Sequence, residues 1–382
     1  MRLPKRPTIY EINVAVWLRR LGEEAGRPPL RLDEVPGAVW DDLAALRVDA
    51  VWLMGVGRRS EAGRALALAD PGRRAAMREA LPDLRDDDVS GSPYCLGEYA
   101  IDERFGGDEG LALARRELAV RGVGLLLGFI PNHVAPDHPW LRGAPDLLIR
   151  GTEHDLATDP GSFLRTPDGI FARGRDPFFP AWPDVVQLNA FAPALREAHI
   201  RVLTAIAQRC DGVRCDMAML LCNEVFARTW GERAGAAPEE EYWTEVIGAV
   251  KTGHPGFTFI AEAYWDMERA LQRQGFDYCY DKRLYDHLVD GDVAAVRRSL
   301  REDVDYQDGL LRFVENHDER RAAAVFEPAR LRAAAVVTSS LPGARLFHDG
   351  QFEGKRVHLP VFLDREPAEP VDRETRAFYR RL

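Results

Sequence analysis

Four short apolar segments of this 382-residue chain end in side chains able to do acid–base or nucleophilic chemistry. The segments are LLLGFIPNH (125–133), CDGVRCDM (210–217), FTFIAEAYW (257–265) and LLRFVENHDE (310–319). An apolar run bounded by polar residues is typical of a buried strand. Parallel α/β barrels build their active sites at the carboxyl ends of such strands. The order of these segments therefore predicts one site assembled from distant parts of the chain.

Two of the segments carry carboxyl groups in unlike surroundings. Arg214 and Asp216 lie two residues apart, so on a strand their side chains share a face, and the arginine favours the ionised carboxylate that a nucleophile needs. Glu262 follows the apolar run FTFIA, whose burial would raise the carboxyl pKa, as a general acid requires. Such a pair is what glycoside cleavage uses. Each signal alone also fits a structural ion pair or a solvated strand end.

The other two segments end in Asn-His pairs. Asn132 and His133 close the first segment, and Asn316, His317 and Asp318 lie near the end of the last. These side chains could bind a metal, cap a helix or hold sugar hydroxyls. Neither pair has the spacing of zinc ligands, so a metal site is the least favoured of the three.

Eight strand candidates alternate with amphipathic stretches, the pattern of a parallel sheet covered by helices. The strands are expected at Thr8 to Trp17, Ala50 to Val56, Val123 to Ile130, Gly212 to Cys215, Phe257 to Ala261, Asp277 to Tyr280, Leu311 to Val314 and Ala344 to Phe347. Helices are expected at Glu109 to Val120, Pro193 to Arg209, Glu239 to Lys251 and Arg330 to Ser340. The sequence therefore predicts an α/β fold of the (β/α)8 TIM-barrel type.

Two connections exceed the usual loop length. Residues 57–99 are expected to carry a helix near Pro71 to Leu81, and residues 134–189 are expected to form one wall of a cleft. We expect a barrel from residues 1–133 and 190–382, with 134–189 as a small inserted domain. Aromatic residues of the insertion could stack on sugars or form its own core; they are Trp140, Phe171, Phe178, Phe179 and Trp182.

Composition limits the classes of partner. A net charge of −10 argues against a broad surface for nucleic acid or anionic membrane. No apolar run approaches the roughly 20 residues of a membrane span, and no signal-peptide core follows the N-terminus. The five cysteines show no Cys-x-x-Cys pair, which favours reduced thiols. We therefore expect a soluble, cytoplasmic protein acting on a small or neutral substrate.

The ordered motifs resemble those of the α-amylase superfamily, glycoside hydrolase family 13. IPNH, GVRCD, AE and ENHD match its four short regions, and SPYCLGEY (92–99) is similar to the segment that supplies a stacking tyrosine. The resemblance covers the chain from about Ile9 to Phe347 and makes residues 134–189 the family's domain B.

The resemblance implies three catalytic carboxylates and four substrate-binding side chains. It gives Asp216 as nucleophile, Glu262 as acid/base, and Asp318 as the carboxylate that binds the 2- and 3-hydroxyls and stabilises the transition state. The substrate-binding set is Tyr94 as a platform under the cleaved glucose, His133 and His317 as hydroxyl donors, and Arg214 as the side chain that holds Asp216.

Three departures from the family pattern carry expectations. Gly128 stands where an aspartate usually supports the arginine, and we expect Gly128→Asp to leave the fold intact. Met219 and Leu220 replace a lysine and histidine pair, which predicts a less polar acceptor side. Although Asn132 matches one calcium ligand, the others are not evident, so we expect no cofactor and no bound calcium. About 35 residues follow the eighth strand, which predicts little or no C-terminal β-sandwich, with HLPVFLDREP (358–367) as a strand or extended cover and a helix from Arg373.

The resemblance implies a retaining α-glucosidic enzyme that forms a covalent glucosyl intermediate on Asp216. Its substrate would be an α-glucan, a maltooligosaccharide or a small α-glucoside, with transfer to water or to another hydroxyl. An alternative is a catalytically impaired barrel of the same fold that binds carbohydrate or a partner, to which only Gly128 points. An isomerase or phosphorylase on the same framework is a third reading.

Overall fold

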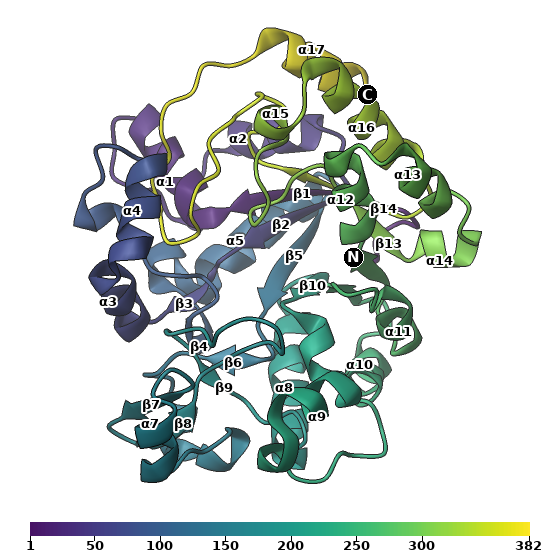
Figure 1. Ribbon diagram of the computed structural model, residues 1–382. Helices are drawn as coiled ribbons and strands as arrows, with labels where there is room; N and C mark the ends of the chain where they lie inside the picture. Colours follow the sequence, from purple (N-terminus) through teal and green to yellow (C-terminus); the bar gives the residue numbers. More distant parts are fainter.

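Eight parallel strands close into a barrel in the computed structural model, which describes residues 1–382 (Figure 1). In spatial order they are β1 (Thr8–Asn13), β2 (Ala50–Met54), β5 (Gly124–Phe129), β10 (Gly212–Cys215), β11 (Thr258–Ala261), β12 (Tyr278–Tyr280), β13 (Leu310–Arg312) and β14 (Ala344–His348). β14 pairs with β1 and closes the ring. The predicted (β/α)8 barrel is confirmed.

Helices surround the barrel. The longer ones are α1 (Val14–Glu24), α2 (Gly37–Ala45), α5 (Gly107–Val120), α8 (Pro193–Ala207), α9 (Asn223–Trp230), α10 (Tyr242–Gly253), α12 (Lys282–Asp290) and α16 (Pro328–Ser340). Shorter ones are α11 (Glu268–Arg273), α13 (Val293–Ser299), α14 (Val304–Asp308) and α15 (Ala322–Val325). The predicted extension of the first strand to Trp17 is wrong, because Val14, Trp17 and Leu18 recur at helical spacing and bury one face of α1.

Successive side chains of each strand point to opposite faces, so the barrel strands contribute to two separate hydrophobic cores. On β5, Leu125 and Leu127 belong to the larger core beneath the helices, whereas Leu126 belongs to a smaller cluster inside the barrel. On β10, Val213 lies in the outer core, so Arg214 faces the interior. The alternation alone therefore turns this buried arginine toward the centre of the barrel.

The two long connections carry their own elements. Between β3 (Gly57–Arg59) and its antiparallel partner β4 (Leu96–Ile101) lie α3 (Glu61–Ala69) and α4 (Pro71–Ala80). The second connection contains β6 (His133–Val134), α6 (Trp140–Gly143), α7 (Glu153–Thr158), β7 (Phe163–Thr166), β8 (Gly169–Ala172) and β9 (Val186–Gln187). In Figure 1 the elements of residues 134–189 lie below the barrel. The division into two domains at these residues stays a prediction.

After β14 the chain runs without helix or strand to α17 (Arg373–Arg381). We call residues 358–365 the C-terminal strap; this part of the yellow segment passes beside α1 and α4 (Figure 1). The strap is an extended cover, not a strand, because it meets its neighbour only through the single bridge Val89↔Leu363. Residues 349–382 form no β-sandwich. No helix has both the length and the apolarity to cross a bilayer.

Candidate active site

One guanidinium lies among three carboxylates at the carboxyl ends of the strands. Arg214 Nη1 lies 2.5 Å from Asp216 Oδ1, and Nη2 lies 3.0 Å from Glu262 Oε1 and 3.6 Å from Asp318 Oδ2. Arg214, Asp216 and Glu262 are buried, and the Asp318 side chain is 37% exposed. The structure thus brings together all three carboxylates singled out in the sequence.

Glu262 is held in place by hydrogen bonds to both of its carboxyl oxygens. Its Oε2 accepts a 2.5 Å hydrogen bond from the Met217 amide, and its Oε1 accepts one of 2.8 Å from the Tyr264 hydroxyl. Met217, which donates the first of these bonds, has a left-handed φ of 45°. Burial raises the pKa of Glu262 to about 7, and Arg214 only partly offsets that effect. A carboxyl group with this pKa can donate a proton near neutral pH.

The other two carboxylates differ from Glu262 and from each other. Burial raises the pKa of Asp216 despite the ion pair with Arg214. The sequence had suggested that the arginine would favour the ionised carboxylate, but its effect is smaller than that of burial. Burial also acts to raise the pKa of Asp318, but the imidazolium of His317 and the guanidinium of Arg214 lower it to about 2. Asp318 is therefore ionised throughout the neutral range.

His317 connects Asp318 to a carboxylate that sequence analysis missed. Its Nε2 lies 3.0 Å from Asp318 Oδ2, and its Nδ1 bonds to Glu11 on β1. Burial lowers the pKa of His317, but the two carboxylates outweigh it and raise the pKa to about 10. The ring of Tyr94 stacks on the charged imidazolium at 5.5 Å between centroids. The signal for Glu11 was an acid at an inward position of the apolar strand TIYEIN.

Aromatic rings surround Arg214, beside the position where the family usually has an aspartate and this chain has Gly128. Gly128 pairs with Arg214 in the β5–β10 register, and a Cβ at Gly128 would meet no atom within 4 Å. The rings of Trp52, Tyr94 and Tyr280 lie 5.4 to 5.5 Å from the guanidinium carbon. The Tyr280 hydroxyl also accepts a 3.3 Å hydrogen bond from Arg214 Nε. These contacts fix the arginine without an aspartate at 128.

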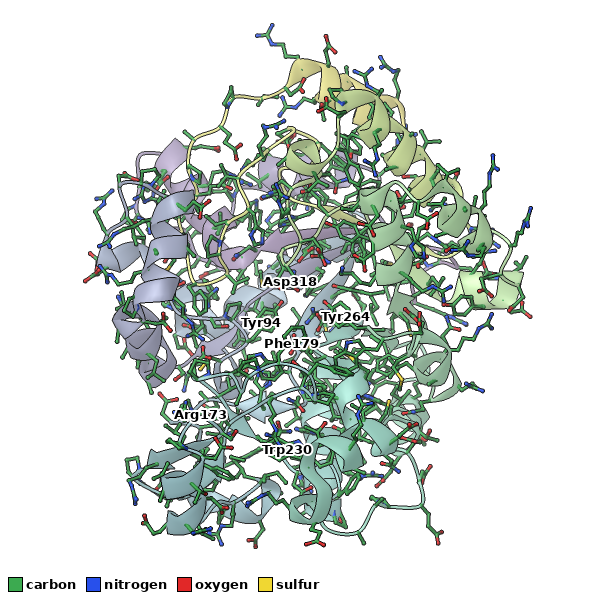
Figure 2. All side chains as sticks on the ribbon, viewed as in Figure 1. Tyr94, Arg173, Phe179, Trp230, Tyr264 and Asp318 are labelled. Atoms are coloured by element: carbon green, nitrogen blue, oxygen red, sulfur yellow. The ribbon has the colours of Figure 1, made fainter.

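The carboxylates open into a cavity of about 790 Å³. Tyr94, Phe179, Tyr264 and Asp318 all line it, and Figure 2 shows them together between the barrel and the inserted region. His133 also lines it. Burial lowers the pKa of His133 to about 4, so its ring is neutral and can exchange hydrogen bonds with hydroxyls.

The aromatic residues of the insertion divide between two roles. Phe171 is fully buried in the small core of the inserted region, and Trp140 packs against that core. Phe179 and Trp182 line the cavity, and Phe178 contacts the exposed Trp265 at 4.8 Å between ring centroids. The insertion therefore uses some aromatic side chains for its own packing and presents others to the site.

The structure bears on three further expectations, which concern the acceptor side, a calcium ligand and a helix cap. Met219 and Leu220 are buried in the outer core and do not line the cavity, so the expected apolar acceptor side does not arise from them. Asn132 exchanges hydrogen bonds with Gln187, and the chain holds no group of three or more His, Cys, Asp or Glu residues placed for a metal. The absence of calcium stays a prediction. Asn316 Oδ1 accepts 2.9 Å hydrogen bonds from the amides of residues 318 and 319 and so fixes a turn rather than capping a helix.

No family model matches the chain. The α-amylase MalA of Haloarcula japonica is 25% identical over 363 residues, which cover 91% of this chain and 44% of that relative. The chain thus spans less than half the length of this relative. Solved structures share the fold: an α-amylase from Lactobacillus plantarum has a TM-score of 0.66 at 20% identity, covering 98% of this chain and 79% of the other. A cyclic α-maltosyl-(1→6)-maltose hydrolase from Arthrobacter globiformis, in complex with maltose, has a TM-score of 0.65 at 17% identity, covering 98% and 82%.

The barrel and the order of the motifs along the chain are consistent with the similarity to this relative. The four motifs lie at the ends of β5, β10, β11 and β13, where their polar residues line or adjoin one cavity. In its fold and in the order of its motifs, the chain is similar to the α-amylase superfamily, glycoside hydrolase family 13.

Proposed function

We propose that the chain is a retaining α-glucosidic hydrolase or transglycosylase acting on α-glucans, maltooligosaccharides or short α-glucosides. The observation that carries this proposal is the contact of one guanidinium with Asp216, Glu262 and Asp318 beside a sugar-sized cavity. The different pKa shifts of the three groups support different roles.

In the first step, the Asp216 carboxylate attacks the anomeric carbon while Glu262 gives its proton to the leaving oxygen. The bond to the leaving group breaks, and an ester between glucose and Asp216 forms. In the second step, the Glu262 carboxylate takes a proton from water or from an acceptor hydroxyl, whose oxygen attacks the same carbon and releases Asp216. The two inversions together retain the α-configuration.

The remaining side chains bind and orient the glucose in this mechanism. Asp318 would accept hydrogen bonds from the 2- and 3-hydroxyls. The charged His317, whose two ring nitrogens face Asp318 and Glu11, would hold Asp318 ionised and in place rather than donate to the hydroxyls, as the resemblance had implied. Tyr94 presents its ring to the cavity, where a sugar face can stack on it. The neutral His133, which follows β5 on the other side of the same cavity, completes the set.

The choice between hydrolysis and transfer depends on the acceptor side. Phe178 and Trp265 are 57% and 36% exposed and offer an aromatic surface near the residues that follow Glu262. A surface of this kind can bind a sugar acceptor and displace water. Product profiles at increasing acceptor concentration measure which outcome dominates.

The experiment that tests the proposal measures release from a nitrophenyl α-glucoside and from maltotriose. Wild type is expected to turn over, and Glu262→Gln and Asp216→Asn are expected to lose at least about 100-fold in kcat. NMR of the first product should show the α-anomer. Equal background release by wild type and by Glu262→Gln would favour a non-catalytic binding barrel, and a β-anomer would refute the retaining mechanism.

Glu268→Gln is the matched control. This carboxyl group is also buried, lines the same cavity and has a pKa that burial raises to about 7. No hydrogen bond or ion pair joins its carboxylate to Arg214 or to Asp216. A much smaller loss than that of Glu262→Gln would assign the acid role to position 262 rather than to any buried carboxyl group nearby.

A further inference from the structure

Three chain segments meet at one side of the cavity. Arg73 comes from α4, Asp184 from the inserted region and Phe362 from the C-terminal strap, and all three line the cavity. Arg73 Nη1 and Nη2 donate hydrogen bonds of 3.0 Å to the two oxygens of Asp184. The Arg73 guanidinium carbon also lies 4.7 Å from the centroid of the Phe362 ring. One arginine thus joins the other two segments into a continuous wall.

The wall is firmly built. The side chains of Arg73 and Asp184 are only 19% and 9% exposed, and a bidentate pair of this kind has a fixed geometry. Leu363 is completely buried against Met77 and Val89, so the strap cannot lift without exposing that cluster. The adjacent Ser90 amide donates a 2.9 Å hydrogen bond to the Phe362 carbonyl. Phe362 is therefore held in place from both sides.

Contacts with the glucose-binding residues place this wall on the donor side of the bond to be cleaved. The Trp182 ring, two residues before Asp184, lies 5.2 Å from the His133 ring. His358 of the strap contacts the His317 carbonyl at 3.0 Å. The leaving group must lie beside the acid Glu262, where the chain continues to the exposed Trp265. The wall therefore adjoins the bound glucose on the side away from the acceptor.

We propose that the wall of Arg73, Asp184 and Phe362 ends the donor side after one glucose unit, so that the protein removes single units from non-reducing chain ends. This inference rests on the proposed function. The 4-hydroxyl of a terminal glucose can donate to Asp184 and accept from Arg73. A glucose whose O4 carries another sugar lacks that hydroxyl, and its next unit would meet the wall.

The test compares maltoheptaose bearing a 4,6-O-ethylidene block on its non-reducing unit with unblocked maltoheptaose. Wild type is expected to release glucose as the first product of the unblocked chain and to act at least about 100-fold more slowly on the blocked chain. Comparable rates on both, with maltose or longer fragments as first products, would overturn the inference and leave the proposed function standing. No turnover of either substrate would instead count against the proposed function.

Substitutions in the wall residues provide a second part of the test. Phe362→Ala and Arg73→Met are expected to raise the ratio of blocked to unblocked cleavage by about tenfold or more, since each removes part of the barrier. Arg74→Met is the matched control, because Arg74 is the next residue of α4 but pairs with Asp86 and does not line the cavity. An unchanged ratio in folded wall variants would overturn the assignment to these residues, and the wild-type comparison remains decisive if a variant does not fold.

Discussion

Filling the space at Gly128 is expected to stabilise the protein. Gly128 lies on β5 opposite Arg214, and a Cβ at this position would meet no atom within 4 Å. A neighbouring cavity of about 50 Å³, lined in part by Gly128 and Trp52, offers room beyond a methyl group. The backbone at Gly128 does not have a positive φ, so alanine can adopt it. Gly128→Ala therefore adds a side chain without a clash.

Two effects set the size of the gain. Replacing glycine with alanine reduces the entropy of the unfolded chain, which contributes about 0.4 to 1 kcal/mol. Burying the methyl group contributes up to about 0.8 kcal/mol more. The unfolding entropy of 382 residues is about 0.8 kcal/mol per degree. Gly128→Ala should therefore raise Tm by about 1 to 2 °C.

Gly212→Ala provides the opposite outcome on the adjacent strand. A Cβ at Gly212 would lie 2.5 Å from the Thr258 carbonyl oxygen and 2.8 Å from the Leu126 side chain. Because the first neighbour is backbone, the strands must move apart to accommodate it. Overpacking of this kind costs about 1 to 3 kcal/mol, which corresponds to a lower Tm by about 1 to 4 °C.

Differential scanning calorimetry of the two alanine variants, and of Gly128→Asp, tests this reasoning. The aspartate variant should remain folded, since its carboxylate can reach toward Arg214. The added negative charge should also raise the pKa of Glu262 and move the alkaline limb of activity to higher pH, which Gly128→Ala should not do. A loss of stability in Gly128→Ala comparable with that of Gly212→Ala would show that position 128 is not open.

Three further predictions concern charge. Since Glu262 must be protonated to act as an acid, kcat/KM should fall as pH rises through about 7, as a pH–rate profile would reveal. The folded-state pKa of His317 is raised from 6.5 to about 10, so this residue contributes stability that is fully present below pH 6.5 and lost as pH rises through about 10. When Tm is measured against pH over that range, it should change less for His317→Gln than for wild type. Asp88→Asn leaves Arg365 and Arg19 without their buried partner, at a cost of about 3 to 5 kcal/mol and a Tm about 4 to 6 °C lower, whereas changing the exposed Asp83 should matter much less.

Local sequence patterns predicted the strands because each is short, apolar and bounded by polar residues. Seven of the eight expected ranges lie within about two residues of the observed strands. The exception is the first, where the apolar run continues without a break from β1 into α1. Apolar runs alone do not distinguish a buried strand from the first turn of a buried helix.

The wall of the cavity was beyond the reach of sequence analysis. Arg73 and Asp184 are 111 residues apart and lie in the two long connections, while Phe362 follows the last strand. None of the three occurs in a motif, and arginine and aspartate are common surface residues. Only the tertiary fold shows that one guanidinium contacts the other two side chains. The alternation of side chains placed Arg214, but it gave no sign that Trp52 and Tyr280 would replace a carboxylate beside it.

The net charge of the buried centre affects both the protonation of Glu262 and the positive charge that would develop on the sugar. Arg214 and His317 supply two positive charges, and the ionised forms of Glu11, Asp216 and Asp318 supply three negative ones. The resulting excess of one negative charge favours the positive charge that develops on the sugar during cleavage. The same excess disfavours ionisation of Glu262, whose pKa is raised by burial and by Asp216 and Asp318. An arrangement that would stabilise an oxocarbenium ion would therefore also keep Glu262 protonated, as the acid role proposed for it requires.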